Sequence, residues 1–474
     1  MVSKLKKLGV FLGPALFFLI IFSPTPSGMP DLANMVLAMS ALMIVWWITD
    51  AIPPYVTALL PLGLLPILGV APIQDVAPEY MNPIVILILG MFLIALAIEK
   101  SGLHKKIAFE LITKFGYEPK RIFLGIMVSA MALSALISNT TVALILIPVV
   151  ITIIKSLENS GIKISRKSQT IIFLGLAYST VFGATVILIG GTPNLIYASV
   201  VEEMIEHSVT FAEWSMLAAP IGVIMFLITA KYLIGNLSKE LSDVSSDQIK
   251  QILISEKSKI GKITREQKVV LFVLIGAITL MYTGPLWHPP DFNVTNAEIA
   301  LLAGISLFLL PKTRKETILT WSHVEKMPFG ILFLLGGGLA LAFAFNISGL
   351  VEYLGNTFSI LSDLPYEVAL VVILTIVIFT TNIKSSTAMA AITLPIVGTL
   401  SILSDWPFLP TMFGVTIAIG FTFLLPTGTP PNALVYEKGG VTTKDMIRYG
   451  LPINLMGIGV ISFFIIVISR FILE

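Results

Sequence analysis

The chain has 474 residues, of which 56% are hydrophobic and only 12% are charged. Soluble proteins average about 45–50% apolar and about 25% charged residues, so this composition excludes a soluble globular protein. The absence of cysteine excludes disulfides, thiolate nucleophiles and cysteine-ligated metals, and the four histidines lack metal-ligand spacing. The net charge of +2 excludes nothing by itself, and we expect no nucleic-acid partner.

Apolar segments long enough to cross a hydrocarbon core of ~30 Å recur from end to end. They predict an all-α, polytopic membrane protein without a soluble catalytic domain. The first segment follows three lysines and precedes Ser-Pro-Thr-Pro rather than a cleavage site, so we predict an uncleaved helix and a cytoplasmic N-terminus. Eleven transmembrane helices are predicted near 8–23, 32–49, 54–70, 83–99, 168–188, 214–235, 269–285, 297–311, 328–346, 411–425 and 450–469.

Two further apolar segments, 121–154 and 367–400, are each too long for one span. A polar cluster interrupts each of them midway, Ser-Asn-Thr at 138–140 and Lys-Ser-Ser-Thr at 384–387. Exposed backbone at membrane depth is tolerated only where it is packed in protein or lines a cavity. We therefore predict two re-entrant helical hairpins with polar tips.

The basic residues agree with this layout. Of 30 lysines and arginines, 28 fall in segments predicted to be cytoplasmic, and the exceptions are Lys384 and Arg470. Such asymmetry is typical of positive-inside sorting, and it would be lost if either hairpin crossed the membrane. The layout places the C-terminus outside, and with the lack of a transit peptide it favours the plasma membrane.

Short motifs from the first half recur in the second half in the same order. Ser-Gly-Leu at 101–103 returns at 348–350, and Gly-Thr-Pro-Asn at 191–194 returns as Gly-Thr-Pro-Pro-Asn at 428–432. Five spans per repeat turn the second copy upside down, which predicts an inverted repeat. The hairpin at 121–154 then enters from the cytoplasm and the other hairpin enters from outside.

The predicted organisation has four parts. An extra N-terminal helix (1–30) precedes the first repeat (31–236), and a cytoplasmic connector (237–268) joins it to the second repeat (269–474). Each repeat contains one hairpin and one helix broken by Gly and Pro, which free the backbone and stop the helix. The predicted breaks lie at 189–195 and 426–433.

Hairpin tips and broken helices offer what an ion site in a membrane needs. Helix N-termini present N–H groups and partial positive charge to an anion, and unwound carbonyls coordinate a cation. These features favour a secondary carrier over a membrane enzyme, since apart from Lys384 the predicted bilayer core has almost no ionisable group and Ser138 has no nearby His or carboxylate in the sequence to activate it. An anion channel remains a more distant alternative.

With these motifs the chain resembles the divalent-anion/sodium symporters, which carry dicarboxylates, tricarboxylates or sulfate. The resemblance runs over essentially the whole length and includes the tips at 138–140 and 385–387 and the stretch Thr-Pro-Pro-Asn-Ala-Leu-Val at 429–435. It implies a homodimer in the lipid bilayer, with fixed scaffold helices and a transport domain that slides as an elevator. It also implies Na⁺ as the coupling ion.

The resemblance further implies three sets of ligands. Substrate carboxylates would be bound by Asn139, Thr140, Thr192, Ser385, Ser386, Thr387, Thr429 and Pro430. A first sodium site would use Ser134, Ser138, Asn139 and Gly191. A second sodium site would use Thr381, Ser385 and Gly428.

The second tip departs from the family pattern. It has Ser386 where the family usually has Asn, and Lys384 precedes it where a small or apolar residue is expected. A lysine near the bilayer centre is costly unless it is paired or solvated. Our hypothesis is that Lys384 replaces the second sodium ion or contacts the substrate, which favours exchange or reduced sodium dependence. The predicted substrate is a C4-dicarboxylate such as succinate, malate or fumarate, and a fully sodium-coupled dicarboxylate or sulfate symporter is the alternative.

Overall fold

The computed structural model describes residues 4–159, 164–237, 246–287, 294–312, 316–325, 327–357, 364–383 and 386–471. All regular structure in these ranges is helical, in accord with the predicted all-α class, and they contain no β-strand. The helices of the first half are α1 (Lys4–Phe22), α2 (Asp31–Thr49), α3 (Pro54–Thr57), α4 (Leu60–Ile67), α5 (Ile73–Val76), η1 (Ala77–Met81), α6 (Pro83–Ser101), α7 (Leu103–Lys114), α8 (Pro119–Ser134), α9 (Asn139–Asn159), α10 (Arg166–Val186), η2 (Leu188–Gly190), α11 (Thr192–Ile205) and α12 (Phe211–Gly235).

The connector contains one helix, and the second half then follows a similar order of elements. The helices are α13 (Ser246–Ile260), α14 (Arg265–Trp287), α15 (Asn296–Leu309), α16 (Trp321–Val324), α17 (Gly330–Ser348), α18 (Leu350–Thr357), α19 (Tyr366–Ile383), α20 (Ser386–Leu403), α21 (Phe408–Gly420), α22 (Pro430–Lys438) and α23 (Thr443–Phe471).

The recurring Ser-Gly-Leu motif ends a helix in the same way in both halves. Gly102 and Gly349 adopt left-handed backbone conformations, with φ of 69° and 74°, immediately after α6 and α17. A glycine is favoured there because other residues are strained at positive φ. In each motif the serine hydroxyl accepts a 3.4 Å hydrogen bond from the backbone N–H of the leucine. Each motif therefore ends one long helix and starts the next.

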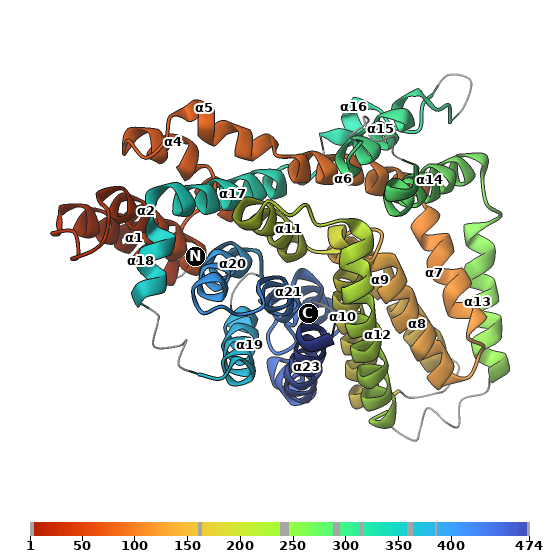
Figure 1. Cartoon of the computed structure of the whole chain (residues 1–474). Coiled ribbons are helices and arrows are strands. Elements are labelled where there is room, and N and C mark those ends of the chain that lie inside the picture. Colours follow the sequence, from red (N-terminus) through yellow and green to blue (C-terminus); the bar gives the residue numbers. More distant parts are fainter. Residues whose placement is uncertain are drawn as a thin grey trace.

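Helix α10 lies at the centre of the molecule, with α8, α9 and α12 on one side and α21 and α23 on the other (Figure 1). Nearly all of its side chains are buried, including Tyr178 and Phe182. These rings pack against Phe423, which follows α21, at centroid distances of 4.9 and 5.4 Å. Residues from the two halves of the chain therefore form one continuous core.

Ten helices of the described part are long and apolar enough to cross a membrane. They include α9, α19 and α20 from the two predicted hairpin segments, whereas the predicted spans at 54–70, 297–311 and 411–425 correspond to shorter apolar helices. Helix length alone therefore does not separate crossing from re-entrant segments. The count of eleven crossings stays a prediction.

Each predicted hairpin segment contains two helices, and the first segment is interrupted at its predicted tip. Residues 135–138 separate α8 from α9, and residues 384–385 fall between α19 and α20. The first helix break also agrees with the sequence, since α10 ends at Val186 and α11 begins at Thr192. The polar and Gly-Pro interruptions are therefore correct markers of where these helices end.

The second break is longer than predicted. The expectation that a span continues to residue 425 is wrong, because α21 ends at Gly420 and α22 begins only at Pro430. The buried Asn382 amide bonds to this segment, since its Nδ2 donates to the Phe421 carbonyl (3.2 Å) and its Oδ1 accepts from the Leu424 N–H (2.7 Å). This side chain satisfies backbone groups that a continued helix would otherwise satisfy.

Close packing of α6 on α15 depends on Gly90. A Cβ atom there would lie 2.3 Å from the backbone carbon of Ala300, so the helices could not stay at this distance. We expect Gly90→Ala to lower the unfolding free energy by about 1–3 kcal/mol, the usual cost of overpacking. Gly276→Ala is the control, because nothing lies within 4 Å of its Cβ position in α14. Thermal unfolding in detergent measures both variants, and equal midpoints would contradict the close contact.

Candidate functional site

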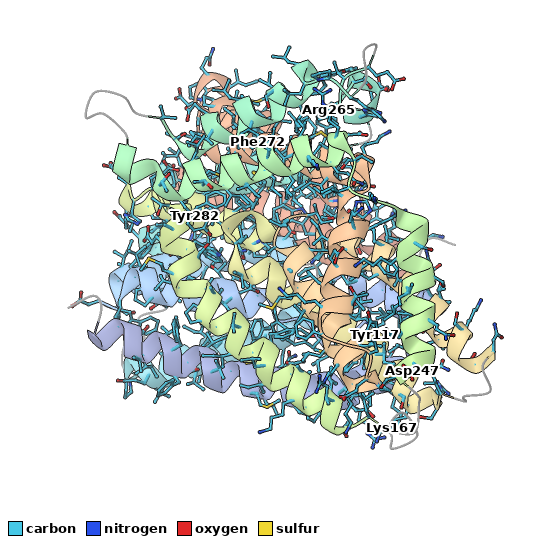
Figure 2. All side chains as sticks on the ribbon, turned by 90° about the vertical axis from the view of Figure 1, so that its right-hand side faces the viewer. Tyr117, Lys167, Asp247, Arg265, Phe272 and Tyr282 are labelled. Atoms are coloured by element: carbon cyan, nitrogen blue, oxygen red, sulfur yellow. The ribbon has the colours of Figure 1, made fainter. Side chains whose placement is uncertain are left out.

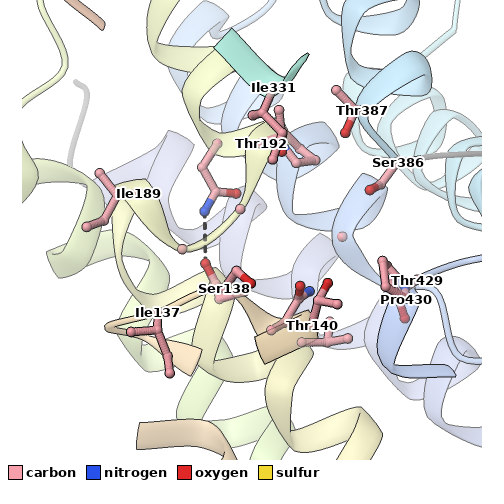
Figure 3. Close-up of a pocket in the computed structure, with 18 of the residues that line it drawn as sticks. Ile137, Ser138, Thr140, Ile189, Thr192, Ile331, Ser386, Thr387, Thr429 and Pro430 are labelled. Carbon is pink, nitrogen blue, oxygen red and sulfur yellow. Dashed lines mark hydrogen bonds between the residues drawn. The ribbon is translucent and has the colours of Figure 1, made fainter. Parts of the chain in front are cut away.

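A cavity of about 850 Å³ lies where the two hairpin tips meet the two helix breaks. Figure 3 shows Ser138 and Thr140 of the first tip, Ser386 and Thr387 of the second tip, and Thr429 of the second break around one space. Helix α6 and the start of α17 complete the wall with apolar side chains. Residues from both halves of the chain therefore line one site.

One asparagine shapes each break. Asn194 Nδ2 donates to the carbonyls of Ala184 (3.0 Å) and Ile187 (3.2 Å). Asn432 Nδ2 donates to the carbonyls of Thr422 (2.8 Å) and Leu425 (3.2 Å) at the same two sequence separations. Both asparagines are buried, so these bonds replace hydrogen bonds that the unwound backbone has lost. The two breaks are thus built by the same local contacts.

Four helices begin at the cavity. Their first residues are Asn139 for α9, Thr192 for α11, Ser386 for α20 and Pro430 for α22, and all four line it. A helix N-terminus carries a partial positive charge and unpaired N–H groups, and each such end stabilises a nearby anion by about 0.3–1 kcal/mol or more. Proline in the first turn of α11 and α22 removes no helical hydrogen bond. The four ends together therefore favour a small anion.

The lining of the cavity favours an anion through dipoles and hydrogen bonds rather than through charged side chains. None of its described lining residues is charged, and the polar groups are hydroxyls, amides and backbone. Hydroxyl and amide groups both donate to carboxylate or sulfate oxygens and accept from water. The site is therefore suited to a small, doubly charged anion held by dipoles and hydrogen bonds.

The structure brings most of the expected ligands together. The expected residues that line the cavity are Ser138, Asn139, Thr140, Gly191, Thr192, Ser386, Thr387, Gly428, Thr429 and Pro430. Ser134 and Thr381 do not line it, because both are fully buried and their hydroxyls donate to the carbonyls of Thr180 and Val377 at 2.7 Å. Lys384 and Ser385 lie outside the described residues.

Sequence reasoning missed two groups of residues. The apolar wall contributed by Met91, Phe92 and Ile331 looks like any other part of a membrane span. Asn382 carried a usable signal, since a buried amide inside an apolar helix needs partners. The structure supplies these partners as backbone groups of Phe421 and Leu424.

Comparison with known proteins identifies the family of the chain. The model for the sodium:sulfate symporter transmembrane region matches residues 5–472. The sodium-dependent dicarboxylate transporter SdcS of Staphylococcus saprophyticus is 35% identical over 467 residues, which covers 96% of this chain and 89% of that protein. SdcS of Staphylococcus aureus is 32% identical over 462 residues, or 95% of this chain and 88% of that protein.

Two solved structures share the fold. MtrF of Neisseria gonorrhoeae, described among antimetabolite efflux pumps, has a TM-score of 0.58 at 15% identity and covers 99% of this chain and 96% of its own. The YdaH transporter of Alcanivorax borkumensis has a TM-score of 0.56 at 12% identity, with 99% of both chains covered. Such low identity shows likeness of fold alone, whereas the family match spans nearly the whole sequence. The chain therefore belongs to the sodium:sulfate symporter family of secondary, multi-pass membrane transporters.

Proposed function

We propose that the chain transports a C4-dicarboxylate such as succinate, malate or fumarate and binds it in the cavity between the two tips. The observation that carries this proposal is the convergence of four helix N-termini on one space without a described charged side chain. The relatives named as dicarboxylate transporters favour this substrate over sulfate. The apolar wall from α6 suits the two carbons that separate the carboxylates of such a substrate.

Sodium is the expected co-transported ion, since the relatives are named sodium-dependent. A first sodium site would use Ser134, Ser138, Asn139 and the Gly191 carbonyl. Hydroxyl, amide and carbonyl oxygens are the ligands that a hard cation accepts, and Ser138 and Gly191 line the cavity while Ser134 is buried in α8. The Ser134 hydroxyl donates a hydrogen bond to the backbone carbonyl of Thr180, which leaves the lone pairs of its own oxygen available for an ion.

The second sodium site would use Thr381, Ser385 and the backbone at Gly428. Lys384 is adjacent to this set in the sequence, and a fixed ammonium there would take the place of the ion. A tethered charge cannot leave to return the carrier empty, so this arrangement favours exchange of one dicarboxylate for another. Transport would then depend less on sodium than in a symporter with two ion sites.

The movement would be that of an elevator. In this proposal both hairpins are re-entrant, and the two repeats have opposite orientation in the plasma membrane, with the N-terminus inside and the C-terminus outside. Equal hydrogen bonding in the two breaks supports a common origin of the repeats. A homodimer would hold the scaffold helices still while the tips and breaks carry the substrate across.

Uptake of labelled succinate into proteoliposomes tests this function. Vesicles are preloaded with unlabelled succinate or left empty, and sodium is present or replaced by a large inert cation. We expect saturable uptake into preloaded vesicles with either cation, and much slower uptake into empty ones without sodium. A strict need for sodium would indicate an ordinary symporter, uptake of sulfate alone would contradict the substrate, and flux without saturation would indicate a channel.

The variant Lys384→Thr tests the substitute charge. We expect it either to make succinate exchange depend on sodium or to stop exchange, because the second site would then need an ion. Initial exchange rates are measured with and without sodium for the variant and for the unaltered chain. Sodium-independent exchange at an unchanged rate would contradict a coupling role for this lysine.

A further inference from the structure

A second cavity, of about 420 Å³, lies between α7 and the connector helix α13. We call it the connector pocket and define it by Lys106, Glu110, Lys257, Lys262 and Ile263. Three lysines and one glutamate give it a formal excess of two positive charges. Phe109 and Gly261 also line it, and no residue is shared with the large cavity.

The pocket joins two connecting segments of the chain. Helix α7 links α6 to α8, and α13 lies between α12 and α14. Lys257 Nζ lies 3.0 Å from Glu110 Oε2, and Lys106 Nζ donates to the carbonyl of Gly261. Lys262 is exposed and makes no hydrogen bond or ion pair with any residue in the described ranges, so its ammonium is available to a ligand.

The pocket lies at the membrane boundary. The apolar span that includes α6 ends at Ser101 and the span of α14 begins at Arg265, and Gln267 Nε2 of α14 donates to the Ser101 carbonyl (2.8 Å). In Figure 2, α13 runs from near Asp247 across the direction of α14, whose course Arg265, Phe272 and Tyr282 mark. The sequence predicts α14 as a crossing, and with α14 across the membrane α13 would lie along the surface, at the depth of the phospholipid headgroups.

Exposed apolar side chains of α14 continue from the pocket toward the membrane interior and form an apolar strip, defined by Phe272 and Ile275. Phe272 and Ile275 on α14 are 77% and 55% exposed, and they lie on the same helical face as the exposed Arg265 and Lys268. Ile263, at the edge of the pocket, is 38% exposed. A phospholipid whose acyl chains lie on this face would have its phosphate beside the lysines of the pocket.

We propose that the connector pocket binds the phosphate of an anionic phospholipid from the cytoplasmic leaflet. A basic pocket between helix ends on the cytoplasmic side is the arrangement that recognises such headgroups. A free phosphate ion shares the headgroup's charge, but it would make no use of the apolar strip on α14. The lipid is therefore the ligand that fits both the charge and the position of the pocket.

The test measures how added lipid changes the thermal unfolding of the full-length chain in detergent. The additions are short-chain phosphatidylglycerol, phosphatidylcholine with the same acyl chains, and inorganic phosphate. We expect saturable stabilisation by phosphatidylglycerol alone. Equal stabilisation by phosphatidylcholine would overturn the charge recognition, and equal stabilisation by inorganic phosphate would overturn the lipid as ligand.

Variants locate the effect. Lys262→Gln breaks no described contact and should weaken the apparent affinity for phosphatidylglycerol about fivefold, the effect of one basic charge near a membrane surface. Glu110→Gln removes the negative charge of the pocket and should raise the apparent affinity for phosphatidylglycerol by a similar factor. The control Lys438→Gln/Lys444→Gln removes two exposed lysines outside the pocket and should leave the affinity unchanged. Equal effects of the control and Lys262→Gln, or weaker binding by Glu110→Gln, would place the lipid elsewhere.

Discussion

Replacing Asn139 by aspartate should weaken succinate binding about a hundredfold while leaving the protein folded. Asn139 is the first residue of α9 and lines the cavity, so the new carboxylate would face the dianion. At an effective dielectric constant of about 20, two unit charges about 6 Å apart repel by roughly 3 kcal/mol, or about a hundredfold in affinity. A carboxylate in the first turn stabilises a helix, so the unfolding midpoint should not fall.

The matched control makes the same change at another helix start. Asn296 is the first residue of α15 and does not line the cavity. Asn296→Asp should therefore bind and transport succinate like the unaltered chain. Saturation of initial uptake rates gives the comparison, with thermal unfolding measured on the same preparations. Asn139→Asp with ordinary affinity for succinate would contradict the placement of the substrate at this helix end.

Replacing either break asparagine by leucine should destabilise the protein and stop transport. Each side chain donates two hydrogen bonds to carbonyls of the unwound segment, and leucine has nearly the same size but no donor. A buried carbonyl left without a partner costs about 1–3 kcal/mol, so each variant should lose roughly 2–5 kcal/mol. Because the contacts are equivalent, Asn194→Leu and Asn432→Leu should have similar effects.

Asn236→Leu serves as the control for these two variants. The Asn236 side chain also donates to a backbone carbonyl, that of Tyr232 (2.9 Å), but it makes one bond at the end of α12 and lies outside the cavity. Its loss should cost about 1 kcal/mol and leave transport intact. Thermal unfolding and succinate uptake are measured on all three variants. A break variant with the stability of the control would show that the asparagine bonds do not shape the break.

Local chemistry explains how much of this site the sequence predicted. The tip at 138–140 and the break at 189–195 were predicted from Gly, Pro and hydroxyl residues inside apolar runs, and the helices end there. Proline alone is a weak signal, since Pro148 and Pro395 lie inside α9 and α20, whereas Gly and Pro beside hydroxyl and amide residues mark the ends of these helices. The expected ligands lie at these helix ends, and most of them line the cavity.

Contacts between distant residues explain the rest. The second break begins at Phe421, whose carbonyl accepts a hydrogen bond from Asn382, 39 residues earlier, and no pattern near 421 indicates this contact. Met91, Phe92 and Ile331 line the cavity only because α6 and α17 pack beside the tips. Side chains of this kind are common in every membrane span, so only the packing identifies them.

Protection of single cysteines by substrate tests most directly whether both halves of the chain hold one anion. The chain has no cysteine of its own, so each variant carries one reactive thiol. Ala135→Cys and Ala433→Cys line the cavity from the first and second halves, and Ser258→Cys is an exposed control on α13. We expect succinate at about ten times its Kd to slow labelling by a charged thiol reagent about tenfold at both cavity positions and not at the control. Protection at one cavity position alone, or at neither, would contradict a shared binding site.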